Sequence, residues 1–158
     1  MVIRNLSELL KNRIFLNVAT ADNSGQPNAA PKFILKYETP HLYLIDYVMV
    51  KTIQNLRVNP RVSLSFMDIN NLEGYRLNGT AELIESGEIF DTLSGEFQKK
   101  ILRLSADRLI EGVRTGKKTE HYELEMPDKF IIIKAQLAEV TRIGSGGDLY
   151  RESGQAIT

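Results

Sequence analysis

HLYLIDYVMVKTIQNLRVNPRVSLSF, residues 41–66, predicts a strand, a turn, one short helix and a second strand. Residues 41–45 and 61–66 each alternate around apolar side chains and are rich in strand-forming residues. Between them, apolar residues recur at helical spacing from position 51 onward. The helix has to end at Asn59-Pro60, because a residue that precedes proline disfavours the helical conformation.

A cation and a hydroxyl, Lys51 and Thr52, stand where the first of these strands gives way to the first turn of the helix. The N–H groups of a first helical turn have no acceptor within the helix, and the helix dipole adds partial positive charge there. The position therefore suits a phosphate group. The alternative interpretation is that Lys51 is a solvated surface lysine and Thr52 an N-cap.

The composition narrows the possible functions. The chain has 158 residues, enough for one domain with a sizeable core, and its 20 Lys and Arg balance 20 Asp and Glu. No overall field therefore attracts nucleic acid or an anionic membrane. The chain has no Cys, which excludes disulfides and thiolate chemistry and fits a cytoplasmic protein. No apolar run is long enough for a bilayer, and residues 1–13 lack the apolar segment of a signal peptide.

The remaining pattern is rich in strands at close spacing. Residues 75–84 alternate without a change of phase through Asn78-Gly79, so Gly79 predicts a bulge or a close backbone approach rather than a hairpin turn. Closely spaced strands with local turns favour an antiparallel sheet closed into a small barrel, and they argue against a doubly wound dinucleotide fold. A short helix is expected at residues 6–11, and further strands at residues 15–21, 27–37 and 129–140.

Residues 86–114 change to helical spacing and predict one long helix or two shorter ones, with Ser94-Gly95 and Ser105 as candidate breaks. A short strand is expected at residues 122–125. The tail after residue 143 contains Gly144-Ser145-Gly146-Gly147 and is expected to be mobile or packed on a partner chain. The predicted organisation is thus one domain, residues 1–143, with a helical insertion at about 86–118 and a tail at 144–158.

Other kinds of site are poorly supported. His41 and His121 are 80 positions apart without ligand spacing, so no metal site is predicted. Glu120, Glu123 and Glu125 are typical of a solvated strand face. The chain has no Gly-x-Ser-x-Gly elbow, and no Lys-Ser/Thr helix follows the glycines of the tail.

Several short motifs follow one another in a characteristic order along the chain. They are residues 15–21, Gly25-Gln26-Pro27-Asn28, residues 42–46, Lys51-Thr52, Asn55-Leu56, Asn59-Pro60-Arg61-Val62 and Gly79-Thr80-Ala81-Glu82. In this order they resemble the pyridoxamine 5'-phosphate oxidase-like family, and the resemblance covers residues 6–84 and the last strand by position and pattern. It implies a six-stranded antiparallel split barrel, a mainly β fold with helices, which dimerises and holds one FMN in each of two clefts between the subunits.

The resemblance also implies site residues, position by position. Residues 30–34 correspond to the strand whose backbone meets the flavin ring. Ile45 and Asp46 correspond to the segment that follows the next strand, with Tyr47 and Val50 close by. Lys51 corresponds to the basic phosphate ligand, and Asn55 lies one turn further along the helix. The cofactor-binding residues predicted in this way are Ala30, Pro31, Lys32, Phe33, Ile34, Ile45, Asp46, Tyr47, Val50, Lys51, Thr52 and Asn55.

This chain departs from the family's vitamin B6 oxidase in ways that bear on the reaction. That enzyme has an arginine before the phosphate-binding lysine, where this chain has Val50, and Lys32 is a candidate to replace the missing charge. The chain also has no Trp, and Tyr150-Arg151 is all that remains of the enzyme's substrate-holding C-terminal segment. Arg57 and Arg61 either reach the phosphate or lie exposed.

Two classes of function stay open. The first is an FMN-dependent oxidoreductase that takes hydride from a nicotinamide or another small substrate, but does not oxidise pyridoxamine phosphate. The second is a non-catalytic FMN-binding or electron-transfer module. A split barrel that holds a deazaflavin or heme is a further alternative. A homodimer with FMN at the subunit interface is expected, with a nicotinamide or another small molecule as electron donor.

Overall fold

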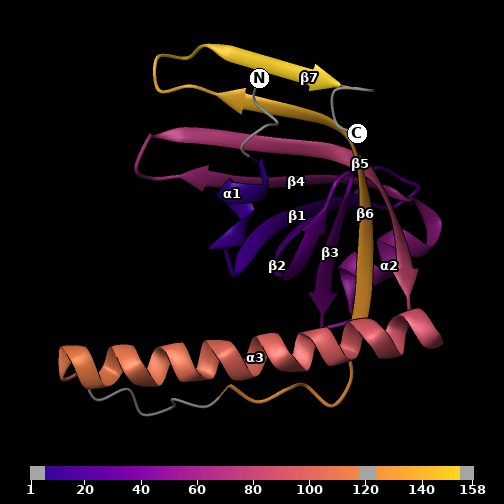
Figure 1. The fold of residues 1–158 in the computed structure, drawn as a ribbon. Helices are drawn as coiled ribbons and strands as arrows, with labels where there is room; N and C mark the ends of the chain where they lie inside the picture. The colour runs from indigo at the N-terminus through magenta and orange to yellow at the C-terminus, as the bar shows by residue number, and fades with distance from the viewer. Residues whose placement is uncertain (1–5, 118–123, 154–158) are drawn as a thin grey trace. The chain divides into compact units, whose positions relative to one another are not determined.

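Six strands of the chain close into an antiparallel barrel, and a seventh extends its sheet (Figure 1). The computed structural model describes residues 6–117 and 124–153. In chain order the elements are α1 (Leu6–Lys11), β1 (Phe15–Ala21), β2 (Pro27–Glu38), β3 (His41–Asp46), α2 (Lys51–Val58), β4 (Arg61–Asp68), β5 (Glu73–Ile84), α3 (Glu88–Thr115), β6 (Ile131–Ile143) and β7 (Leu149–Ser153).

The strand order in the sheet is β3-β2-β1-β4-β5-β6-β7, and an additional pairing of β3 with β6 closes the ring. That closing ladder is antiparallel and runs from His41 opposite Gln136 to Asp46 opposite Ile131. The closing ladder pairs the outer side of β3 with β6, which leaves less unpaired strand edge than an open sheet would have. The predicted six-stranded antiparallel split barrel is confirmed.

The barrel interior is filled by apolar side chains that alternate along the strands, as the sequence pattern predicted. In β4, for example, Val62, Leu64 and Phe66 are buried, while Arg61 and Ser65 face outward. α1 adds Leu6 and Leu10 to the same core. The apolar residues of the described chain with no exposed area are Val18, Leu42, Leu44, Ile45, Leu64, Leu77, Ile132, Ile133, Ala135 and Val140.

Gly79 lies at a bulge, as the unbroken alternation of residues 75–84 predicted. The register between β5 and β6 shifts between Asn78 and Gly79, and β5 continues through both residues. A Cβ atom at position 79 would lie only 2.0 Å from the carbonyl oxygen of Gln136. Glycine is therefore required here, because the two backbones approach too closely for any side chain.

Residues 85–129 form a second compact unit, separate from the unit of residues 1–84 and 130–158. Its main element is one helix, α3, so neither Ser94-Gly95 nor Ser105 breaks it. The Ser94 hydroxyl donates to the carbonyl of Phe90, and the Ser105 hydroxyl accepts from the Leu124 N–H. α3 ends at Gly116 in the left-handed conformation, φ 67°. Of the strand expected at 122–125, residues 122–123 lie outside the described residues, and the other two positions are not in a strand.

The expected tail differs from the structure at residues 149–153, because these form β7 and pair with β6 of the same chain. The glycine-rich stretch that suggested mobility instead makes the hairpin turn: the Gly144 N–H donates to the carbonyl of Asp148, and Gly147 takes a φ of 85°. The guanidinium of Arg142 also lies 4.5 Å from the ring centre of Tyr150. Residues 154–158 lie outside the described residues.

Candidate functional site

The first turn of α2 is built as the sequence predicted, with Lys51 as its first residue. The N-cap is Val50, which makes no side-chain cap, and the first helical hydrogen bond runs from the Gln54 N–H to the Val50 carbonyl. The N–H groups of residues 51–53 therefore have no acceptor within the helix. The alternative role of Thr52 as an N-cap is wrong, because Thr52 is the second helical residue.

Side-chain amides tie α2 to the strands beside it. The Asn28 amide donates to the Thr52 hydroxyl at 3.2 Å, and the Asn55 amide donates to the Thr20 hydroxyl at 3.1 Å. Thr52 and Asn55 are 2% and 1% exposed. The Asn59 amide donates to the carbonyl of Ala21. These bonds hold α2 against β1 and β2. Within this chain, the buried side chains of Thr52 and Asn55 therefore stabilise the position of the first helical turn.

Lys51 carries the accessible charge at this turn. Its side chain is 43% exposed, and its Nζ lies 3.7 Å from Oδ2 of Asp22. Asp22 itself accepts from the hydroxyl and N–H of Ser24 and from the N–H of Gln26. The Ser24 hydroxyl is the largest of the contacts that lower the pKa of Asp22, so this carboxylate is ionised at neutral pH. The 3.7 Å separation is longer than a hydrogen bond, so the ammonium can turn toward an anionic ligand.

Lys32 pairs with Asp46 and is not available to the phosphate for which the sequence analysis considered it. Its Nζ lies 2.9 Å from Oδ2 of Asp46, with side chains 6% and 0% exposed. The other oxygen of Asp46 accepts from the N–H groups of Val48 and Met49, each at 3.0 Å. Lys32 is therefore held by Asp46 and does not present a free charge that would replace the arginine absent at position 50.

The predicted ring-binding strand presents backbone more than side chains. Phe33, Ile34 and Ile45 are buried, and Phe33 packs edge-to-face on Phe15, with ring centres 5.7 Å apart. The β2 ladder to β3 begins at Phe33, whereas the ladder to β1 extends back to Pro27. Ala30 is half-buried and Pro31 exposed. Along residues 30–32, one edge of β2 thus lies outside the β3 ladder, which fits the docking of a planar ring on backbone groups.

Apolar side chains lie exposed on the loop that joins this strand region to Lys51. Tyr47 is 48% exposed, Val48 62% and Val50 53%. Large apolar side chains in adjoining positions are typical of a surface that another molecule covers. Arg57 and Arg61 are both exposed, so the alternative that placed them on the surface agrees with the structure.

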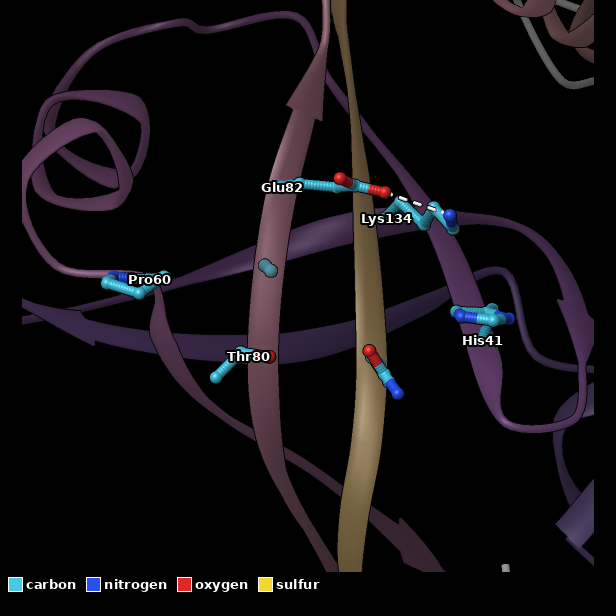
Figure 2. A pocket seen from close by; sticks show the side chains of 7 residues that line it. His41, Pro60, Thr80, Glu82 and Lys134 are labelled. Carbon is cyan, nitrogen blue, oxygen red and sulfur yellow. Dashed lines mark ion pairs between the residues drawn. The ribbon is translucent and has the colours of Figure 1, made fainter. Parts of the chain in front are cut away.

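A separate cavity of about 280 Å³ lies among β3, β5 and β6, where β4 begins (Figure 2). Glu82 and Lys134 face one another across β5 and β6, with 2.8 Å between Oε1 and Nζ, and this bond raises the pKa of Lys134. Sequence reasoning missed the cavity, because the register that brings these residues together cannot be read from alternation. None of the residues predicted to bind flavin lines this cavity. Its lining is His41, Pro60, Thr80, Ala81, Glu82, Lys134 and Gln136.

Residues 6–117 and 124–153 contain no group of three or more His, Cys, Asp or Glu side chains arranged to hold a metal ion. No helix within the same residues is both long and apolar enough to cross a membrane. His121 and its neighbours Glu120 and Glu123 lie outside the described residues.

Residues 3–141 match the family described as pyridoxamine 5'-phosphate oxidase, and this chain belongs to that family. One relative is the uncharacterized protein MJ0282 of Methanocaldococcus jannaschii, 32% identical over 119 residues, which span 73% of this chain and 76% of the relative. The ordered motifs had indicated this family, and the assignment is confirmed.

Solved structures share the fold at low sequence identity. A Clostridium acetobutylicum protein related to general stress protein 26 superposes with a TM-score of 0.69 at 15% identity, covering 99% of this chain and 96% of its own. A Nostoc punctiforme FMN-binding protein superposes with a TM-score of 0.55 at 15% identity, covering 94% of this chain and 91% of its own. A heme-binding protein of Mycobacterium smegmatis superposes with a TM-score of 0.65 at 16% identity, covering 94% of this chain and 56% of its own. An F420 reductase superposes with a TM-score of 0.55 at 16% identity, covering 85% of this chain and 94% of its own.

Proposed function

We propose that this protein binds FMN and acts as an oxidoreductase that exchanges hydride or electrons with a nicotinamide or another small substrate. The observation that carries the proposal is the turn at Lys51. The helix start offers an exposed ammonium and three N–H groups without helical acceptors, its Thr52 is bonded to Asn28 of β2, and residues 30–32 of that strand lie outside the β3 ladder. A cation, a helix start and a strand edge without a ladder partner together suit a ligand with a phosphate at one end and a planar ring at the other.

The described residues divide the work of binding. Lys51 and the N–H groups of the first helical turn would hold the phosphate. The backbone of residues 30–32 would meet the ring, and Tyr47 and Val50 would shield it from water, since both are exposed apolar side chains beside the turn. When bound, FMN supplies hydride or single-electron chemistry, and the chain's own groups set access and polarity around it.

We infer that the physiological reaction is not pyridoxamine phosphate oxidation. Val50 stands where the vitamin B6 oxidase has an arginine, and Lys32 does not supply that charge, because its ammonium is paired with Asp46. The chain has no Trp, and its C-terminal residues Tyr150 and Arg151 lie in β7. The arrangement supports a flavin site without the substrate-holding segment of that enzyme.

We further infer a two-fold homodimer that completes the flavin site. The candidate residues form one wall only: a strand edge, a loop and a helix start. Tyr47, Val48 and Val50 leave apolar area uncovered next to the proposed ring position. A second copy related by a two-fold axis would cover this area twice and exclude water from both rings.

The test is a spectroscopic titration of the purified protein with FMN, with heme and with the deazaflavin F420. Stoichiometric FMN binding with a perturbed flavin spectrum, followed by bleaching with NADH or NADPH under anaerobic conditions, is the expected result. Tight binding of heme or F420 with no binding of FMN would overturn the cofactor assignment. FMN binding without bleaching by any donor would favour the non-catalytic module.

A further inference from the structure

A buried ion pair lies beside the proposed flavin site, and the function proposed above leaves its role unassigned. Lys32 and Asp46 lie on β2 and β3, one position beyond the pair formed by Phe33 and Ile45. Their charged atoms are 2.9 Å apart, and almost nothing of either side chain reaches solvent. Replacing such a pair by apolar residues of similar volume is often neutral or stabilising, so its presence calls for a role other than stability.

Asp46 connects this pair to the loop before α2. Its Oδ2 atom pairs with the ammonium of Lys32, while its Oδ1 atom accepts hydrogen bonds from the N–H groups of Val48 and Met49. Met49 is held at a φ of 53°, in the left-handed region that residues with a Cβ rarely adopt. A conformation of this kind persists only where surrounding contacts determine it. The two bonds to one carboxylate supply such contacts two residues before Lys51.

We propose that Lys32 and Asp46 are positioning residues for the phosphate-binding turn: Asp46 fixes the loop that aims Lys51, and Lys32 fixes Asp46. This inference rests on the proposed FMN site. Lys32 offers the carboxylate an opposite charge 2.9 Å away in a buried position, where an unpaired charge would be costly. The carboxylate in turn orders residues 47–50, so the turn meets a phosphate without first paying the entropy of ordering the loop.

The variant that tests this replaces both partners, Lys32→Met together with Asp46→Leu. No charge is left buried, so the barrel is expected to fold, but the Val48 and Met49 N–H groups lose their acceptor. The matched control is Lys36→Met with Glu38→Gln, which removes a pair of the same 2.9 Å length from the same strand, with side chains 26% and 59% exposed. FMN and riboflavin affinities are measured by fluorescence titration, and amide exchange at residues 48 and 49 by NMR.

The double variant is expected to bind FMN about tenfold more weakly, and riboflavin affinity should fall by a clearly smaller factor. Loss of order at Tyr47 and Val50 affects the ring of both ligands, whereas displacement of the phosphate turn affects FMN alone. Exchange at residues 48 and 49 should accelerate about tenfold or more. The control should match wild type in both readouts. A variant that binds both ligands like wild type, or loses both equally, overturns the positioning role.

Wild-type amide exchange decides the matter should the double variant fail to fold. The Val48 and Met49 amides must be as protected as those of β3, and exchange as fast as an open loop would overturn the inference. This measurement needs no flavin. It therefore separates the two proposals: absence of FMN binding by wild type would refute the proposed function, while protected amides would still support the ordered loop.

Discussion

Replacing Lys51 with alanine tests the proposed phosphate site directly. The side chain is 43% exposed, so its charge acts through a medium between water and protein interior. A hydrogen bond to a charged group contributes about 1.5–3 kcal/mol, and the lower end applies at this exposure. Lys51 loses little when its ammonium turns away from Asp22, 3.7 Å away, because surface ion pairs contribute about 0–1 kcal/mol to stability. A net loss of about 1.4 kcal/mol corresponds to about tenfold weaker FMN binding.

The assay compares FMN with riboflavin, which lacks the phosphate, in the same fluorescence titration. Lys51→Ala should weaken FMN binding about tenfold and leave riboflavin binding nearly unchanged. Asp22→Asn provides a counter-test, because it removes the competing carboxylate and should strengthen FMN binding by up to about fivefold, an effect lost when Lys51 is also replaced. Equal losses of FMN and riboflavin affinity in Lys51→Ala would refute the assignment of the phosphate to this turn.

Gly79→Ala should destabilise the fold by more than about 3 kcal/mol in urea unfolding, because its Cβ would lie 2.0 Å from the Gln136 carbonyl oxygen. The control is Gly95→Ala, whose Cβ would have nothing within 4 Å. Similar stability of the two variants would contradict the reasoning. Burial, and then the hydrogen bond to Glu73, raise the pKa of Tyr75 to about 12. The neutral phenol is thus favoured in the folded state, so its contribution to stability is complete below pH 10 and is lost as the pH rises through 12. The measurement is an absorbance titration at 295 nm, in which Tyr75→Phe should remove a late step. A titration curve that keeps this step in the variant would contradict the prediction. Reduction by NADH or NADPH should exceed turnover of pyridoxamine phosphate, and robust turnover of that substrate by the purified protein would reverse the order.

Local patterns predicted much of the barrel. The alternation of residues 61–66 and 75–84 predicted strands, and Asn59-Pro60 predicted the end of α2, because these signals depend on neighbours in the chain. The strand β7 was missed. Its partner lies across a turn whose glycines also suit a mobile tail, and the ladder to β6 and the Arg142 contacts with Asp148 and Tyr150, which distinguish the two cases, cannot be read from the sequence.

The chemistry of the site was less accessible to sequence reasoning. Lys32 was considered as a phosphate ligand because charge can be read from the sequence, whereas the depth and register that bring it to Asp46 cannot. The Lys134–Glu82 pair and its cavity were missed for the same reason. Position along the chain predicted the helix start at Lys51, but pairing across strands determines which charges near it remain available to a ligand.

That availability bears on the class of reaction. At the proposed site, the carboxylates and amines of the described residues are already engaged: Lys32 and Asp46 hold one another in a buried pair, and Lys51, with Asp22 beside it, is assigned to the phosphate. None of these four groups is placed as a general base for a substrate on the ring. Hydride transfer from a nicotinamide needs no protein proton donor or acceptor at the reacting carbon. The arrangement therefore favours a nicotinamide donor over an amine substrate, which must lose a proton from nitrogen before or as its hydride leaves.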